Sequence, residues 1–263
     1  MRASAESLVA LGLVLTIGVA GAAAQAERIQ TDRPSVSTSA STVPVGSLQM
    51  ESGAGYSYTS ISGSPAEKQF TLDLTWRAGL TERFEFRLEG QPLVLTRNEQ
   101  DDTGIGNLTL DAKYRFIDGR EDSWWPSVGV LPFVTFPVAH VPHGKNAPDF
   151  GLIGILSFDL PLRLSLDANF AVGGAAQRPT GYLVQGAISA ALGLDIGERW
   201  STFAEVFYTS AAERGARDSV GFDAGVQFFV TQRIALDASG QTSLAGPGPD
   251  YLFRAGLSVR FGR

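Results

Sequence analysis

The stretch Phe70-Thr-Leu-Asp-Leu-Thr-Trp-Arg-Ala-Gly-Leu80 decides the fold class, because apolar and polar side chains alternate along it without a break. The Phe, Leu, Trp and Ala side chains fall on one face, and the Thr, Asp, Arg and Gly positions fall on the other. Successive side chains of a β-strand point to opposite faces, whereas a helix of this sequence would mix both classes on every side. The stretch is therefore predicted to be a β-strand with one apolar and one polar face.

The same alternation recurs along most of the chain. After the turn at 81–83 it resumes over 84–89, so these two runs are predicted to form a hairpin. Further regular runs cover 108–116, 162–170, 220–230 and 234–239. Less regular strands are expected at 48–59, 127–137, 150–160, 182–196, 200–209 and 251–261, which makes twelve in all.

The predicted connections alternate between short turns and longer polar loops. Short turns are expected at 81–83, around Pro161, at 197–199 and at 231–233, with a longer connection at 117–126 on the same end. Polar loops that contain Gly or Pro are expected at 60–67, 96–103, 138–149, 173–181, 210–219 and 240–250. An even number of strands, with short turns at one mouth and longer loops at the other, is typical of a bacterial outer-membrane barrel.

An exported antiparallel sandwich would alternate in the same way, and the placement of aromatic residues separates the two folds. Aromatic side chains gather near the turn ends, at Trp76, Phe84, Tyr114, Phe116, Trp124, Trp125, Trp200, Phe228 and Phe261. A second group lies near the loop ends, at Tyr56, Tyr58, Tyr182, Tyr208, Tyr251 and Phe253. Two girdles suit the two membrane interfaces, whereas a sandwich core holds its aromatics at mid-strand. The sequence favours an all-β, antiparallel, up-and-down transmembrane β-barrel of about twelve strands over residues 48–261.

The first 26 residues are predicted to be a secretory signal peptide for the Sec pathway. Arg2 precedes an apolar run at 8–20 and a small-residue tract at 21–26, and cleavage fits before Gln25 or before Glu27. The alternative is an uncleaved anchor, although the run is shorter than the ~20 residues that a spanning helix needs. We therefore expect export to the outer membrane of a Gram-negative cell.

Composition excludes several other classes of function. The chain has no Cys and a formal net charge of −6, so thiolate metal sites, Cys nucleophiles and a basic nucleic-acid surface are all unsupported. The two histidines, His140 and His143, have only Asp149 nearby as a further ligand. Gly104-Ile-Gly106 lacks the third glycine of a dinucleotide site. We expect no enzyme activity, no catalytic residues, no cofactor and no metal.

Four segments carry a resemblance to a known family: Ile29–Pro34, Thr42–Gly53, Trp76–Arg87 and Gly104–Arg115. In these segments the chain resembles the phenol-degradation (MetA-pathway) family of outer-membrane transporters, with Asn107 standing where the family usually has an acidic residue. The resemblance implies a transporter-like barrel and leaves the ligand open.

The last strand resembles the C-terminal signal that the barrel assembly machinery recognises. It ends on the aromatic Phe261, although Gly262 and Arg263 follow. Outer-membrane lipid is the other expected partner, and the acidic loop Glu99–Asp102 suits cations that bridge lipopolysaccharide phosphates. The alternative for that loop is a solvated tip.

In a barrel the polar face lines the lumen, and both signs of charge are interspersed there. The candidate lumen residues are Asp73, Arg77, Glu85, Arg87, Glu89, Asp111, Lys113, Arg115, Asp167 and Asp223. These charges could order water and polar solutes, or they could neutralise one another across a narrow, largely filled lumen.

The polar segment 27–47 is either a lumen plug, with Asp32 and Arg33 as its candidate residues, or a free periplasmic tail. Two functions follow from these alternatives. The first is a transporter or channel for a small, apolar or aromatic solute. The second is a non-transporting structural or surface-interaction barrel.

Overall fold

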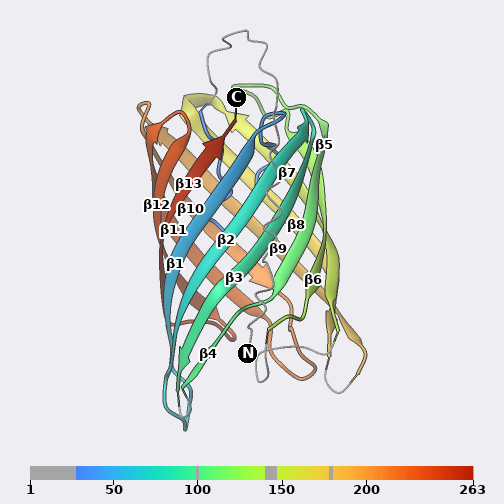
Figure 1. Ribbon diagram of the computed structural model, residues 1–263, viewed down its shortest axis with the longest axis vertical. Coiled ribbons are helices and arrows are strands. Elements are labelled where there is room, and N and C mark those ends of the chain that lie inside the picture. Colours follow the sequence, from blue (N-terminus) through green and yellow to red (C-terminus); the bar gives the residue numbers. More distant parts are fainter. Residues whose placement is uncertain (1–27, 99–100, 140–146, 178–179, 263) are drawn as a thin grey trace, which may run out of the picture.

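The chain folds into one closed, antiparallel β-barrel (Figure 1), which the computed structural model describes over residues 28–98, 101–139, 147–177 and 180–262. The signal peptide predicted at 1–26 and the histidines His140 and His143 lie outside these residues. The strands are β1 (Leu48–Thr59), β2 (Glu67–Thr81), β3 (Phe84–Arg97), β4 (Asp102–Gly104), β5 (Leu108–Ile117), β6 (Ser127–Phe136), β7 (Asp149–Leu160), β8 (Leu164–Ala176), β9 (Tyr182–Ile196), β10 (Trp200–Thr209), β11 (Ser219–Thr231), β12 (Ile234–Ala245) and β13 (Tyr251–Phe261).

Twelve of these strands make the wall, and the predicted fold class is confirmed. Each long strand pairs with the next along the chain, and β1 closes the ring by pairing with β13 from Leu48↔Phe261 to Tyr58↔Tyr251. The remaining strand, β4, has three residues and pairs only with β3, inside a connection that the sequence predicted to be a loop. Among the described residues, no helix is long and apolar enough to cross a membrane.

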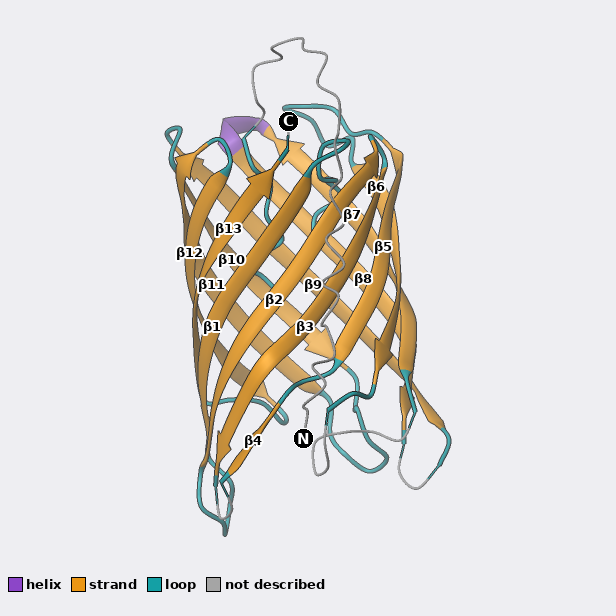
Figure 2. Cartoon of the chain, viewed as in Figure 1, coloured by secondary structure: helices purple, strands orange, loops and turns teal. Residues whose placement is uncertain are grey.

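The barrel has two unlike mouths, seen at the two ends of Figure 2. The turn mouth holds the short connections and the end of β13 at Phe261, and the loop mouth holds the longer connections. Aromatic pairs lie on the outer surface near both: Trp76 and Phe261 at 6.4 Å near the turn mouth, and Tyr58 and Tyr251 at 5.2 Å near the loop mouth. The alternation predicted for β2 therefore sends its apolar side chains outward and its polar ones into the lumen.

The start of β8 differs from the sequence prediction. Leu162 and Arg163 belong to a 3-10 turn, Pro161–Arg163, and the strand begins at Leu164. Both residues have positive φ angles, 65° and 62°, because the chain must reverse within three residues here. The apolar–polar alternation continues through the turn, so the periodicity alone could not separate turn from strand.

Candidate transport path: inner segment, lumen and wall pocket

Residues 28–47, which we call the inner segment, run inside the barrel before β1 begins. Coil inside the upper half of the barrel is visible in Figure 2. The Ile29 N–H donates to the Gln232 carbonyl at the turn mouth (2.9 Å), and the Gly46 N–H donates to the Gly79 carbonyl near the same mouth (2.9 Å). The segment therefore enters from the turn mouth and returns to it, and it occupies the half of the lumen nearer that mouth, the turn half.

Asp32 is held by cations from three neighbouring wall strands. One of its oxygens, Oδ2, lies 2.9 Å from Arg87 Nη1, 2.9 Å from Lys113 Nζ and 3.4 Å from Arg77 Nη1. The Lys113 side chain is 0% exposed and the Arg77 side chain is 1% exposed. Charges buried to this extent must be paired to be tolerated, so Asp32 is a structural counter-ion for this part of the wall.

Arg77 links this cluster to two further carboxylates. Its Nη1 lies 2.7 Å from Glu51 Oε1, and its Nε and Nη2 donate to the two oxygens of Glu85, each at 3.0 Å. A planar guanidinium suits such two-point binding of a carboxylate. Glu85 also accepts the Val43 N–H at 2.7 Å. The wall residues are thus bonded to one another and to the inner segment.

The opposite wall holds the rest of the segment through hydrogen bonds to its backbone. The Glu205 carboxylate accepts the N–H groups of Val36 and Ser37, both at 2.7 Å, and the Asn169 Oδ1 accepts the Thr38 N–H at 2.8 Å. The Ser37 and Ser189 hydroxyls are 2.7 Å apart. The segment is therefore attached to both sides of the barrel.

The remaining predicted lumen residues divide between the lumen and its rim. Asp111 lies 3.2 Å from Arg87, which also contacts Glu89, and Asp167 accepts the Ser157 hydroxyl. Asp223 lies 3.1 Å from Arg254, and Asp73 lies 3.8 Å from Arg33 of the inner segment. Arg115 differs from them, because it pairs with the exposed Asp118 at 3.0 Å on the rim of the turn mouth.

An apolar strip on the inner wall was missed by the sequence analysis. Leu131 and Ile155 are buried against Ala40 of the inner segment, with Phe133 and Ile153 beside them. The corresponding runs of β6 and β7 are apolar at both alternating positions, which is the pattern of a strand covered on both faces. That absence of alternation was the available signal.

Two cavities flank the inner segment inside the lumen. The loop half, the half nearer the loop mouth, holds a chamber of about 620 Å³ lined by residues that include Glu67, Gln69 and Asp73. The turn half holds a cavity of about 510 Å³ lined partly by Arg28 and Asp195. Residues of the inner segment line the second cavity and contact Asp73 of the first, so the segment lies between them.

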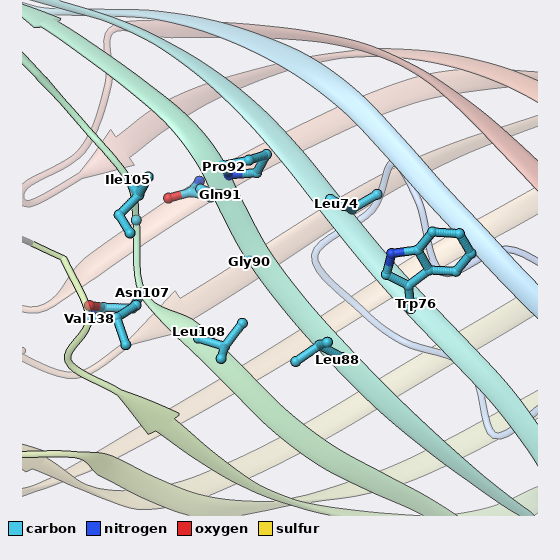
Figure 3. A pocket seen from close by; sticks show the side chains of 11 residues that line it. Leu74, Trp76, Leu88, Gly90, Gln91, Pro92, Ile105, Asn107, Leu108 and Val138 are labelled. Carbon is cyan, nitrogen blue, oxygen red and sulfur yellow. The ribbon is translucent and has the colours of Figure 1, made fainter. Parts of the chain in front are cut away.

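A third space lies on the outside of the wall, where β3 and β5 separate (Figure 3). Their pairing ends at Gly90↔Leu108, and an apolar pocket of about 430 Å³, the wall pocket, opens beside it. Leu74, Trp76 and Leu88 line it together with these two residues.

A recess of about 370 Å³ lies in the same stretch of wall, lined by lumen-facing residues such as Asp73 and Glu89. The wall pocket and this recess share four lining residues: Leu74, Gly90, Gln91 and Asn107. Gln91 also lines the loop-half chamber. The chamber, the recess and the wall pocket are therefore neighbours across a single layer of wall.

The local sequence explains this separation. Leu72 pairs with Leu93 but Leu74 pairs with Gly90, so two residues of β3, Gln91 and Pro92, lie opposite the single residue Asp73 in a bulge. Proline has no N–H to donate to a neighbouring strand, which ends a regular ladder. The Gln91 side chain instead donates to Asp73 at 2.8 Å, and its carbonyl accepts the Gly106 N–H at 2.8 Å.

The described ranges contain no group of three or more His, Cys, Asp or Glu side chains arranged to hold a metal ion.

Comparisons with known proteins agree with this architecture. The family model described as "Putative MetA-pathway of phenol degradation" matches residues 31–261. No curated protein matches the chain.

Among solved structures, a COG4313 outer membrane channel from Pseudomonas putida F1 superposes with a TM-score of 0.69 at 16% identity, over 84% of this chain and 98% of that one. The NanC porin gives 0.58 at 13% identity, over 81% and 98%. The translocator domain of the autotransporter NalP from Neisseria meningitidis gives 0.53 at 10% identity, over 82% and 88%. At these identities the likeness is one of fold.

Proposed function

Because the chain belongs to the family described as "Putative MetA-pathway of phenol degradation", we propose that this barrel is an outer-membrane channel for small apolar or aromatic solutes. The solute reaches the chamber in the loop half from the loop mouth. It then leaves sideways between β3 and β5 into the bilayer, without passing the inner segment. The observation that carries the proposal is the wall pocket adjoining the recess, because the two share four lining residues.

The two exits from the chamber differ in polarity, and this supports the sideways route. The path along the barrel axis passes the charges around Arg33 and Asp32. An apolar solute that separated these ion pairs would offer the charges no contacts in return. The wall pocket is lined by Leu74, Leu88 and Leu108, and its volume of about 430 Å³ lies within the usual range for small-molecule sites.

One test separates the sideways route from the axial one by fixing the inner segment. Ser37→Cys and Ser189→Cys replace two hydroxyls that are 2.7 Å apart, in a chain without other cysteines. In a Gram-negative host that expresses the variant, uptake of radiolabelled phenol or toluene should be equal in the oxidised and reduced forms. Uptake that is lost on oxidation and restored by a reductant would show that solutes pass the inner segment.

A second test obstructs the wall pocket. Gly90→Phe places a ring between β3 and β5, and Gly154→Phe places the same ring on β7, away from the pocket. We expect Gly90→Phe to reduce aromatic uptake toward the level of cells without the protein, and Gly154→Phe to leave it unchanged. Equal uptake by both variants would reject the sideways route. Equal uptake by cells with and without the wild-type protein would favour the non-transporting barrel instead.

A further inference from the structure

Arg33 of the inner segment lies across the seam where the barrel closes. Gly53 of β1 and Gly256 of β13 are direct partners in the pairing of the first and last strands. A Cβ built on Gly53 would lie 2.0 Å from Arg33 Nη2, and one built on Gly256 would lie 2.7 Å from Arg33 Nε. The guanidinium thus occupies the space that two side chains would otherwise fill.

Two carboxylates extend this glycine pair on both sides. Asp73 is the partner of Gly53 on β2, and Asp237 is the partner of Gly256 on β12. Arg33 lies 3.3 Å from Asp237 and 3.8 Å from Asp73. The cross-strand row Asp73–Gly53–Gly256–Asp237 therefore forms a binding site for the Arg33 guanidinium, which we call the seat. It has a carboxylate at each end and no side chain in the middle.

The neighbouring residues of the segment contact the same strands. The Glu51 carboxylate of β1 accepts the Arg33 N–H at 3.2 Å, and Arg254 of β13 donates to the Pro34 carbonyl at 3.4 Å. The seat is split between the two ends of the chain, because β1 and β2 supply one half and β12 and β13 supply the other. It is complete only when β1 has paired with β13.

We propose that Arg33 is a staple for barrel closure, so that docking of the inner segment and pairing of the first and last strands stabilise each other. A group that binds only the closed form must stabilise that form, by linkage. This role is independent of the transport proposal, since it holds for a barrel that carries no solute.

A double-mutant cycle on the full mature chain tests whether Arg33 uses the seat. Gly53→Ala adds one methyl group whose three nearest neighbours are all atoms of Arg33. In the wild-type background it should lower the urea midpoint of unfolding from lipid vesicles. In an Arg33→Ala background it should leave the midpoint unchanged or raise it, because Ala suits a strand better than Gly. The same loss in both backgrounds would overturn the proposal.

Cross-linking then tests whether Arg33 acts through the seam. Ala54→Cys with Ala255→Cys bridges β1 to β13, and Ala204→Cys with Ala224→Cys bridges β10 to β11 as a matched control, since each pair is in direct register. The loss of stability caused by Arg33→Ala should shrink in the disulfide-linked seam and persist in the linked control. An equal loss in both linked proteins would show that Arg33 stabilises only its own segment.

Discussion

The two halves of the lumen are built from the same alternating strands but differ in what fills them. In the turn half, the inner segment and the charged side chains of β1, β2, β3 and β5 occupy the space, and Arg77, Glu85 and Lys113 are buried. In the loop half, a chamber of about 620 Å³ is lined by polar residues such as Glu67 and Gln69, which are half-buried.

This difference shows that a lumen-facing charge has no fixed role. Where a partner from the inner segment meets it, as Asp32 meets Arg87, the charge holds the barrel together. Where the strands continue past the segment, as at Glu67, the charged side chain lines the loop-half chamber. Substitutions in different parts of the barrel should therefore differ in the stability that they cost, and three comparisons measure these differences.

The largest effect is expected from the buried ion network of the turn half. Arg77→Ala leaves Glu51 and Glu85 without the guanidinium that lies 2.7 Å and 3.0 Å from them, so it should lower the free energy of unfolding by about 3–5 kcal/mol. Arg97→Ala, at the exposed loop-mouth end of β3, should change it by less than about 0.5 kcal/mol. Urea titrations from lipid vesicles measure both. Similar losses would mean that the two halves are equally dependent on their charges.

A somewhat smaller difference in stability is expected between a substitution on the outer face and one in the loop-half lumen. Leu72→Arg places a charge on the lipid side of β2 and should cost about 2–4 kcal/mol if the residue lies near the bilayer midplane. The adjacent Thr71→Arg points into the loop-half chamber, where water can solvate the guanidinium, so it should cost much less. The same titrations compare the two. If Thr71→Arg proved as costly, the chamber would be dry or filled.

The regular strands could be predicted from sequence because one physical rule, apolar outward and polar inward, acts along β2 and along most of β11. The end of β11 departs from it, because Phe229 faces inward and packs on Ile29 of the inner segment. The same rule failed at Leu162, where a turn happens to keep the alternation. It was also uninformative for β6 and β7, whose inner positions Leu131 and Ile155 pack on the inner segment. A partner inside the barrel changes the pattern that a hydrated lumen would impose.

The candidate site was less predictable than the fold. Alternation along a strand predicts which charged residues face the lumen, but it does not predict the partner of each charge. Asp32 meets Arg77, Arg87 and Lys113 only because the chain folds back into the barrel. The wall pocket depends on a bulge at Gln91 and Pro92 and on where β3 and β5 stop pairing. Register of this kind is set by contacts between distant segments, which one sequence does not display.

The smallest effect is expected at the loop mouth, where an exposed contact also spans the seam. The Ser60 N–H and hydroxyl both donate to Asp250 Oδ2, at 2.8 Å and 2.5 Å, and these bonds lower the pKa of the Asp250 carboxyl. A carboxyl whose pKa is lower in the folded state stabilises it above the unfolded pKa of about 3.9, and that contribution is lost as the pH falls through the folded value.

The Asp250→Asn variant isolates this contact from the rest of the barrel. Because Asp250 is exposed, we expect its urea midpoint to lie only slightly below that of the wild type at pH 7, with the difference shrinking as the pH is lowered below 4. Paired titrations of the two proteins at each pH remove the pH dependence that both share. If Asp250→Asn lowered the stability at pH 7 as much as Arg77→Ala does, closure at the loop mouth would depend on the exposed Ser60–Asp250 hydrogen bonds as strongly as the turn half depends on its buried ion network.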